Sequence, residues 1–489
     1  MLNAMKIPNF IEKIIKTFKQ NSFEAYLVGG CVRDLLMGKE PGDWDMTTNA
    51  RPEKMLKIFS DSKYENEFGT VLIKIKNKKN ETEHVIEATT YRSEGAYSDR
   101  RHPDDIQFET ELDKDLERRD FTINAMAMTK VIEPKIKDWD IIDLFGGQKD
   151  IKLKIIRAVG EPIDRFREDA LRMMRAVRFS CQLGFSIEPK TERGILKMAG
   201  SIRFIANERI HDELVKILKT DRAYEGIMKL HELKLLQYII PELEQGRGVP
   251  QNHHHIYSVF KHNILSLKNC PSKDWRVKLA SLLHDIGKVK ARKIIKGQTT
   301  FYNHEYIGER MTRKIMTRLK FSKEDMEKVT NLVRNHMFYY DADEVTASSV
   351  RRLVVKVGEG NLKDLIDIRI ADRLGSGTPK GKPYKLRHLE YMMKKVQSDP
   401  ISVKMLKING EDLMKLLNIV PSPKIGTILD VLLSEVIEDP KLNTKEYLEN
   451  RSRELNDLNA DDLRQKAKEI IARERAEDDQ KMKEEFWVK

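Results

Sequence analysis

The chain has 489 residues, and 89 lysines and arginines against 77 aspartates and glutamates give it a formal net charge of +12. Its 40% hydrophobic and 34% charged residues exclude a largely disordered protein and predict about three globular domains. No apolar run approaches the roughly 20 residues that cross a bilayer, no secretory signal opens the sequence, and three separated cysteines (Cys31, Cys181 and Cys270) exclude a disulfide framework, so we expect a cytoplasmic protein.

In chain order, residues 1–25 predict an amphipathic helix and AYLVGG predicts a strand that ends in a glycine pair. Residues 64–92 alternate as β-structure around a polar turn, whereas the charged residues 93–118 predict a loop outside the core. From about residue 160 helical periodicity dominates. We therefore expect an α+β fold divided into a head with a mixed sheet (1–155), a helical region (156–245), a second helical domain (246–375) and a helical C-terminal region (376–489).

The segment LVGGCVRDLLMGKEPGDWD combines an anion site with a pair of carboxylates. Gly29 and Gly30 let the backbone approach a ligand closely, and the free N–H groups of the following helix, together with Arg33, suit a phosphate. Asp43 and Asp45 lie two residues apart, so on a strand they would face one side and hold Mg²⁺. Such ions would activate a hydroxyl and neutralise a triphosphate. Glu87 is a candidate third carboxylate, although a solvated strand glutamate explains it equally well.

Further ordered motifs follow this segment: RRDFTINAMA (118–127), DLFGGQKD (143–150), REDALRMMRAVRF (167–179) and ANERIHDEL (206–214). Together the five motifs resemble the bacterial class II tRNA nucleotidyltransferase and poly(A) polymerase family, within the polymerase-β-like nucleotidyltransferases. The resemblance covers roughly residues 20–220. It implies a catalytic head in which Asp43 and Asp45 hold Mg²⁺ as the cofactor, with Glu87 as our candidate for the further carboxylate. It also implies that Arg119 contacts the incoming nucleotide and that Asp120 binds the ribose or orients an arginine.

The same resemblance makes Asp169 and Arg172 the readers of the base. The carboxylate accepts from the amino group of cytosine or adenine and the guanidinium donates to the neighbouring ring nitrogen, whereas uracil and guanine present the opposite polarity. Taken alone, the spacing is equally consistent with a salt bridge on one helix face, with Arg175 and Arg178 as solvated neighbours. In the family, Arg175 and Arg178 correspond to positions that hold the nucleotide or its phosphates.

A second set of residues resembles the HD-domain metal-dependent phosphohydrolases. His262, the dyad His284–Asp285 and Asp372 follow in the order of the ligands of one ion, and His304 and His336 are candidates for a second. Imidazole and carboxylate suit a divalent transition metal such as Mn²⁺, Ni²⁺, Fe²⁺ or Zn²⁺, and the sequence does not choose between them. We read His253, His254 and His255 as having no ligand role. The site would activate water against a phosphoester, or the domain would be purely structural.

The expected reaction is addition of C, C and A to tRNA from CTP and ATP without a nucleic-acid template. Residues 91–105 look like the flexible loop of enzymes that complete CCA, and we hypothesise that residues 93–105 reposition Asp169 and Arg172 between C and A. The alternatives are a poly(A) polymerase or a CC-adding or A-adding enzyme of the same family, an HD phosphohydrolase whose head recruits RNA, and a non-catalytic RNA-binding scaffold. Candidate basic stretches for tRNA are Lys380–His388 and Arg451–Arg473. No membrane and no protein partner is inferred.

Overall fold

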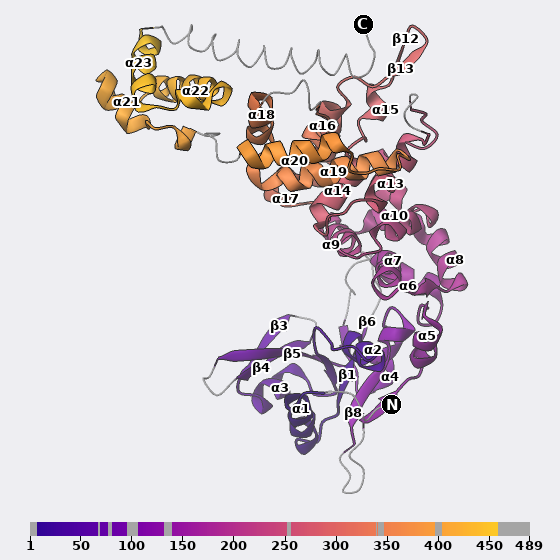
Figure 1. Ribbon diagram of the computed structural model, residues 1–489. Coiled ribbons are helices and arrows are strands. Elements are labelled where there is room, and N and C mark those ends of the chain that lie inside the picture. The colour runs from indigo at the N-terminus through magenta and orange to yellow at the C-terminus, as the bar shows by residue number, and fades with distance from the viewer. Residues whose placement is uncertain are drawn as a thin grey trace. The chain divides into compact units, whose positions relative to one another are not determined.

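The computed structural model describes residues 7–66, 69–76, 81–94, 106–131, 139–251, 256–338, 340, 347–396 and 403–457. It comprises two compact units, Met1–Pro241 and Glu242–Lys489, which are described separately (Figure 1). The four-part division therefore stays a prediction. Residues 95–105, His253 to His255 and residues 458–473 lie outside the described residues.

A mixed seven-stranded sheet forms the N-terminal part of the first unit, in the order β3-β4-β5-β2-β1-β8-β9. Neighbouring strands are antiparallel except β2 and β5, which are parallel. The expected mixed sheet is thus confirmed. The strands of this sheet are β1 (Ala25–Val28), β2 (Asp45–Thr48), β3 (Ser62–Asn66), β4 (Thr70–Lys76), β5 (Thr82–Thr90), β8 (Ala127–Lys130) and β9 (Trp139–Ile142).

The helices of this part are α1 (Asn9–Gln20), α2 (Gly30–Leu36), α3 (Pro52–Ile58), α4 (Leu112–Glu117), the 3₁₀ turn η2 (Thr122–Asn124) and α5 (Gly147–Leu153). The predicted first helix is confirmed, because its apolar face is buried in the head core with side chains of β1, β2, β4 and β5. The expectation of a loop outside the core over residues 93–118 is wrong at both ends. β6 (Arg92–Glu94) pairs with β7 (Ile106–Phe108), and α4 buries Leu112 and Leu116. A six-residue helix is too short to show periodicity in a charged segment.

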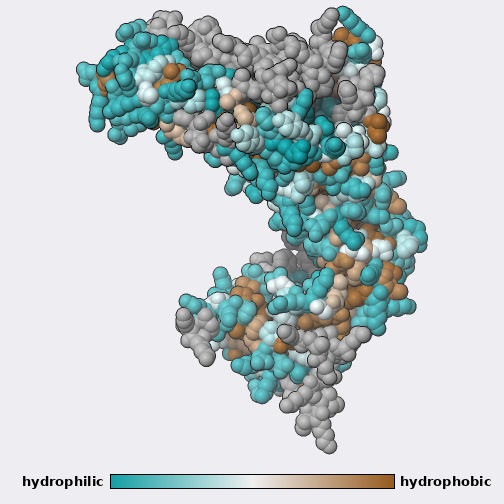
Figure 2. Space-filling view, in the orientation of Figure 1, coloured by the Kyte–Doolittle hydropathy of each residue, from teal (hydrophilic) through white to brown (hydrophobic). Residues whose placement is uncertain are grey.

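The rest of the first unit is helical, as expected. Its elements are β10 (Ile155–Ile156), α6 (Pro162–Glu168), α7 (Leu171–Leu183), β11 (Ser186–Ile187), α8 (Pro189–Met198), η3 (Ala199–Phe204), α9 (Asn207–Leu218), α10 (Ala223–Glu232) and α11 (Leu236–Ile239), and α12 (Pro241–Glu244) begins at its end. β10 and β11 pair in parallel, and α6 and α7 lie between them in the sequence. Figure 2 shows apolar residues on the surface around α5, α6 and α8, where Leu153 and Leu196 are exposed.

Among its described residues, the second unit is helical apart from one hairpin. Its elements are α13 (Val259–Lys268), α14 (Trp275–Leu283), α15 (Lys288–Ala291), the hairpin strands β12 (Lys293–Ile295) and β13 (Gln298–Thr300), α16 (His304–Arg318), α17 (Lys323–Asn335), α18 (Ala347–Val357), η4 (Glu359–Asn361), α19 (Leu362–Gly375), α20 (Tyr384–Val396), η5 (Val403–Met405), α21 (Gly410–Leu417), α22 (Pro423–Glu438), η6 (Pro440–Leu442) and α23 (Lys445–Asn456). A separate apolar cluster joins α21, α22 and α23. No helix in the described part of the chain combines the length and apolar character that a bilayer crossing requires.

Candidate active site and metal centre

An arginine-rich cavity of about 420 Å³ opens in the first unit. It is lined by six arginines and three aspartates, an excess of positive charge that suits a polyanion such as a triphosphate. Its lining combines residues from four of the motifs that the sequence singled out. These residues are Gly29, Gly30, Arg33, Asp45, Arg118, Arg119, Asp120, Asn124, Asp169, Leu171, Arg172, Arg175, Phe179 and Arg209.

The three candidate catalytic carboxylates gather where β2 begins. Asp45 is the first residue of β2 and lies in register with Glu87 on the parallel strand β5, so the two side chains share one face of the sheet. Asp43 is exposed in the bend before β2, so its expected place on the strand is wrong. Pro41 and Gly42, which directly precede Asp43, delay the start of the strand. Burial raises the pKa of Asp45. The charge of Asp43 raises it further, while Arg119 opposes the shift.

Glu87 experiences the same electrostatic environment. Its partial burial raises its pKa first, and the charges of Asp45 and Asp43 raise it further. A carboxylate whose pKa is raised by neighbouring carboxylates favours a bound cation, and oxygen donors of this kind fit Mg²⁺. The donor chemistry of Asp43, Asp45 and Glu87 therefore fits the ion that the sequence predicted, with Asp43 and Glu87 outside the lining of the cavity itself.

Gly29 lies close to the side chains of Arg119 and Asp45. Its φ of 73° is in the left-handed region, and a Cβ atom there would lie 3.3 Å from an Arg119 Nη atom and 3.7 Å from an Asp45 carboxylate oxygen. Gly29 therefore leaves room for the Arg119 and Asp45 side chains, while the predicted approach of a ligand to the glycine pair stays a prediction. Arg119 also donates to Asp115 at 2.9 Å, and Arg118 donates to the other oxygen of Asp115 at 2.8 Å. Burial opposes ionisation of Asp115, yet the two guanidinium groups lower its pKa to about 2.

Asp120 is a buried acceptor that orients arginines. Arg175 donates to its Oδ2 at 2.8 Å, and Asn124 donates to its Oδ1 at 3.2 Å. Burial opposes its ionisation, but Arg175 and Arg172 lower its pKa. The amide oxygen of Asn124 in turn accepts from Arg33 at 2.8 Å. Asn124 thus connects two of the predicted arginines. Sequence reasoning missed it, although it lies within the motif RRDFTINAMA.

Asp169 and Arg172 both line the cavity, but they do not pair with each other. Asp169 precedes α7 in an extended conformation and accepts the backbone N–H of Leu171. Its carboxylate accepts from Arg209 at 2.7 and 3.2 Å. Arg172 donates to Glu168 at 2.7 Å and to the carbonyl oxygen of Arg118 at 2.9 Å. The expectation that Asp169 and Arg172 share a helix face is therefore wrong, because α7 begins after Asp169.

Arg178 points away from the cavity lining. It donates to the buried Glu213 at 2.6 Å, and its guanidinium lies 4.1 Å from the ring centroid of Phe179. The guanidinium groups of Arg33 and Arg175 lie 5.4 and 5.3 Å from the same ring. Phe179 therefore separates three arginines through cation–π contacts, which limits their mutual repulsion. The predicted contact of Arg178 with the nucleotide stays a prediction.

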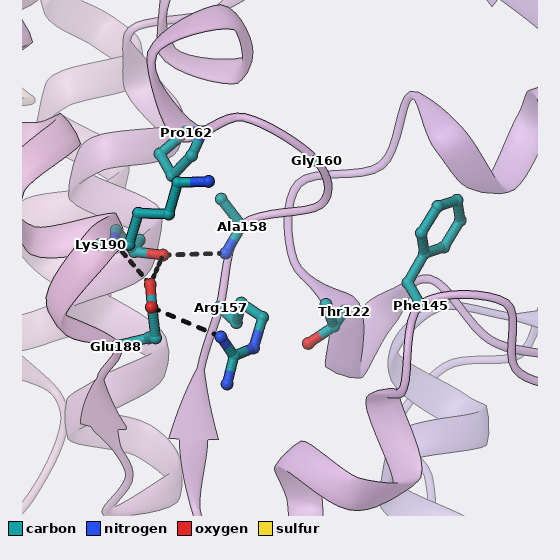
Figure 3. A pocket seen from close by; sticks show the side chains of 9 residues that line it. Thr122, Phe145, Arg157, Ala158, Gly160, Pro162, Glu188 and Lys190 are labelled. Atoms are coloured by element: carbon teal, nitrogen blue, oxygen red, sulfur yellow. Dashed lines mark hydrogen bonds and ion pairs between the residues drawn. The ribbon is translucent and has the colours of Figure 1, made fainter.

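A smaller cavity of about 200 Å³ lies beside β10 and α8 (Figure 3). In Figure 3, Arg157 and Glu188 face each other on one side, while Phe145 lies on the other. Arg157 also pairs with Asp150 at 2.9 Å, and Lys190 pairs with Glu161 at 2.6 Å. The larger cavity has more arginines than acidic residues in its lining and combines four of the sequence motifs, so it is the better candidate for a charged ligand.

The second candidate site lies within the second unit, where all six predicted ligands converge. His262, His284, Asp285 and Asp372 have candidate donor atoms within 4.8 Å of one another, and so do Asp285, His304 and His336. Asp285 belongs to both groups: one oxygen lies 2.9 Å from Nε2 of His262 and the other 3.1 Å from Nε2 of His304. Its carboxylate is thus placed to bridge two ions.

The backbone fixes how three of these imidazoles are oriented. The Nδ1 atoms of His284, His304 and His336 lie 2.7 to 2.9 Å from carbonyl oxygens three residues earlier. Since a carbonyl only accepts, each Nδ1 carries a proton, so Nε2 is the ring nitrogen that faces the centre and could bind a metal. Nε2 of His304 lies 3.3 Å from Nε2 of His336. Two facing lone pairs repel unless a cation lies between them, so these residues fit a metal.

Burial and neighbouring charges shift the pKa of two histidines at this centre. Burial alone would lower the pKa of His284, but Asp285 and Asp372 raise it to about 10. Burial lowers the pKa of His336 to about 4. Lys288 lies 2.6 Å from Asp285. A Cβ atom at Gly287 would overlap the carbonyl oxygen of His304, which explains the glycine that follows the His–Asp dyad.

Three family descriptions match separate parts of the chain. "Poly A polymerase head domain" matches residues 25–157, and "Probable RNA and SrmB- binding site of polymerase A" matches residues 184–246. "tRNA nucleotidyltransferase domain 2 putative" matches residues 299–451. These matches cover both units, and the first contains the carboxylates and the glycine turn.

The curated relatives include an A-adding enzyme and CCA-adding enzymes. An A-adding tRNA nucleotidyltransferase of Deinococcus radiodurans is 34% identical over 336 residues, which are 66% of this chain and 74% of that protein. A CCA-adding enzyme of Geobacillus stearothermophilus is 43% identical over 227 residues, 46% of this chain and 53% of that protein. The match thus spans about half the length of the CCA-adding relatives.

Solved structures share the fold. The CCA-adding enzyme of Bacillus stearothermophilus in complex with CTP aligns with a TM-score of 0.65 at 28% identity, over 92% of this chain and 98% of that one. The CCA-adding enzyme of Thermotoga maritima complexed with tRNA aligns with a TM-score of 0.57 at 21% identity, over 93% of this chain and 97% of that one.

Proposed function

Because the chain belongs to the tRNA nucleotidyltransferase and poly(A) polymerase family, we propose that it adds C, C and A to the 3′ end of tRNA from CTP and ATP. The supporting observation is that one cavity brings together Gly29, Asp45, Arg119, Asp169 and Arg172. These residues come from separate motifs and provide the three functions that the reaction needs: an anion site, a carboxylate and a base-reading pair.

In this proposal each group acts on a different part of the nucleotide. Arg33, Arg119 and Arg175 bind the phosphates, and Asp45 acts with Asp43 and Glu87 at the reacting centre. Mg²⁺ bound by these carboxylates supplies charge neutralisation and activation of the 3′-hydroxyl. Asp169 accepts from the base amino group and Arg172 donates to the ring nitrogen. Arg172 also donates to Glu168 in this structure, so a base would share the guanidinium with that carboxylate or displace it.

Single-nucleotide incorporation tests the proposal. tRNA ending at the discriminator base is incubated with CTP, with ATP, or with both, and the products are resolved to one nucleotide. We expect two C residues from CTP alone and one further A when ATP is added. Long runs of A from ATP alone would indicate a poly(A) polymerase instead. Addition of CC without A, or of A only to tRNA that already ends in CC, would indicate a partial enzyme.

A second candidate function is supported by the convergence of six side chains in the second unit. We propose that this centre binds two divalent transition-metal ions, with Asp285 between them, and hydrolyses a phosphoester. His262, His284 and Asp372 would hold one ion, and His304 and His336 the other. The ions would supply an activated water, while Lys288, which lies against Asp285, would limit the negative charge of the centre.

Phosphatase assays separate this function from nucleotide addition. The wild type and a His284→Ala/Asp285→Ala variant are assayed on a 2′,3′-cyclic phosphate with Mn²⁺, Ni²⁺, Fe²⁺ or Zn²⁺. We expect metal-dependent hydrolysis by the wild type alone and equal CTP incorporation by both proteins. Absence of hydrolysis by the wild type with every metal would contradict the proposal.

A further inference from the structure

The outward face of α20 carries a row of exposed aromatic side chains. Tyr384, His388 and Tyr391 lie four and three residues apart, so they occupy one face of the helix. The exposed fractions of Tyr384 and Tyr391 are 63% and 58%. The opposite face is buried and consists of Leu386, Leu389, Met393 and Val396. Packing within the unit therefore explains the leucines, methionine and valine of α20 but not its tyrosines.

These rings form a continuous surface. The ring centroids of Tyr384 and His388 are 5.8 Å apart with an interplanar angle of 30°, and those of His388 and Tyr391 are 6.2 Å apart. Tyr340, which follows α17, contacts His388 from the side: its hydroxyl lies 2.5 Å from Nδ1. This bond fixes the imidazole between the two tyrosines. We call Tyr384, His388 and Tyr391 the aromatic row.

Positive charge surrounds the aromatic row. Residues 378–396 contain six lysines and arginines and a single acidic residue, Glu390, which pairs with Lys382 at 2.5 Å. Lys385, Arg387 and Lys394 are exposed on α20 beside the row. α20 itself lies along α19 in the second unit (Figure 1). Exposed π-faces bordered by cations match a ligand that combines flat rings with phosphates.

We propose that the aromatic row is a stacking platform for unpaired nucleobases of the RNA substrate, with Arg387 and Lys394 binding the adjacent phosphates. Stacking on tyrosine tolerates any base, because every base has a π-face. The face therefore suits unpaired bases of a folded RNA rather than a duplex, whose bases are already stacked. This inference rests on the proposed function only in assuming an RNA substrate, and it concerns a surface distinct from both candidate catalytic sites.

Direct binding of tRNA, without nucleotides, tests the proposal across a series of salt concentrations. A Tyr384→Leu/Tyr391→Leu variant keeps apolar volume but removes the rings, and Tyr384→Phe/Tyr391→Phe keeps them. We expect the leucine variant to weaken binding about tenfold or more at every salt concentration, and the phenylalanine variant to bind like the wild type. An Arg387→Gln/Lys394→Gln variant should instead lower the salt dependence of binding. Tyr64→Leu, on the exposed face of β3, is the matched control.

Two further measurements distinguish a failure of the stacking platform from a failure of the proposed nucleotide addition. A fully paired RNA duplex should bind the leucine variant and the wild type equally. If the leucine variant binds tRNA as the wild type does, or loses duplex binding to the same extent, the stacking platform is overturned. CTP incorporation is measured in parallel on every protein. A wild type that incorporates nothing but binds tRNA through the rings would refute nucleotide addition and leave the platform intact.

Discussion

Arg209 donates to both carboxylate oxygens of Asp169, across 40 residues of sequence. Together with the backbone N–H of Leu171, this ion pair fixes a carboxylate that lies outside regular helix. Under the proposed function, Asp169 would meet the base with its orientation already set, because much of the entropic cost of orienting it has been met during folding. Arg209 acts here as a positioning residue, since its own contact is with Asp169.

Loss of this pair should degrade the choice of base. We expect Arg209→Ala to lower kcat/KM for CTP and ATP about tenfold or more and to raise the relative incorporation of UTP, because Asp169 loses its fixed orientation. Arg203→Ala, an exposed arginine of the same helical region, is the matched control. A variant with unchanged selectivity for C and A over U would show that Arg209 serves stability alone.

The register of Asp45 and Glu87 predicts a shared catalytic role. Asp45→Asn and Glu87→Gln should each reduce nucleotide incorporation by about 100-fold or more, the scale of losing one electrostatic contact to a transition state. CTP binding should change far less, because the arginines remain. Glu83→Gln, on the same strand, is the control. Wild-type rates for Glu87→Gln would leave Asp43 and Asp45 as the only catalytic carboxylates.

Asp115 predicts a pH dependence of stability. Its pKa is lowered from 3.8 to about 2, so the ionised form stabilises the fold above pH 4, and this contribution is lost as pH falls through 2. The shift corresponds to about 2 kcal/mol. Denaturant unfolding of the wild type and Asp115→Asn should differ most at neutral pH, and the difference should disappear only as pH falls to about 2. A constant difference across this range would contradict the assignment.

Metal content gives a test of the bridging role of Asp285 that does not depend on activity. Elemental analysis after equilibration with Mn²⁺ is made in an Asp43→Ala/Asp45→Ala background, so that the carboxylates of the first unit do not contribute, and should find two ions when the histidine centre is intact. His336→Ala should retain one ion, and Asp285→Ala should retain neither, because both groups of ligands need its carboxylate. His388→Ala, outside the centre, should match the wild type. Two ions in Asp285→Ala would exclude the bridge.

Two glycines should respond oppositely to alanine. A methyl group at Gly287 would overlap the backbone of α16, so Gly287→Ala should displace His304 and lower both the melting temperature and metal content. Gly426 lies within α22 with open space around its Cβ position, and Gly426→Ala should be stabilising by about 0.5–1 kcal/mol. Thermal unfolding measures both. Equal behaviour of the two variants would show that the overlap is relieved without cost.

Local patterns predicted most of the elements and the membership of both sites. The His–Asp dyad, the other three histidines and Asp372 converge as expected, because each stands in a helical pattern with a recognisable motif. Contacts between side chains that lie far apart in the sequence were not predictable. Glu168, Arg209 and Asn124 lie within the quoted motifs, but the sequence does not show which side chains they contact, and only the packing of α9 and η2 brings the last two to the cavity. The start of α7 after Asp169 depends on the break following α6, which helical periodicity did not reveal.

In the first unit, Asp45 and Glu87 lie on strands β2 and β5 and Asp43 lies just before β2, whereas Arg172 and Arg209 belong to α7 and α9 and Asp169 lies between α6 and α7. Substitutions can therefore alter these two sets separately. Under the proposed function, substitutions in the helical set would change which nucleotide is accepted, while the carboxylates keep their places on and beside β2 and β5. This separation would give a lineage a route from one terminal sequence to another through intermediates that all remain polymerases, and relatives named for adding A and for adding CCA are consistent with that route.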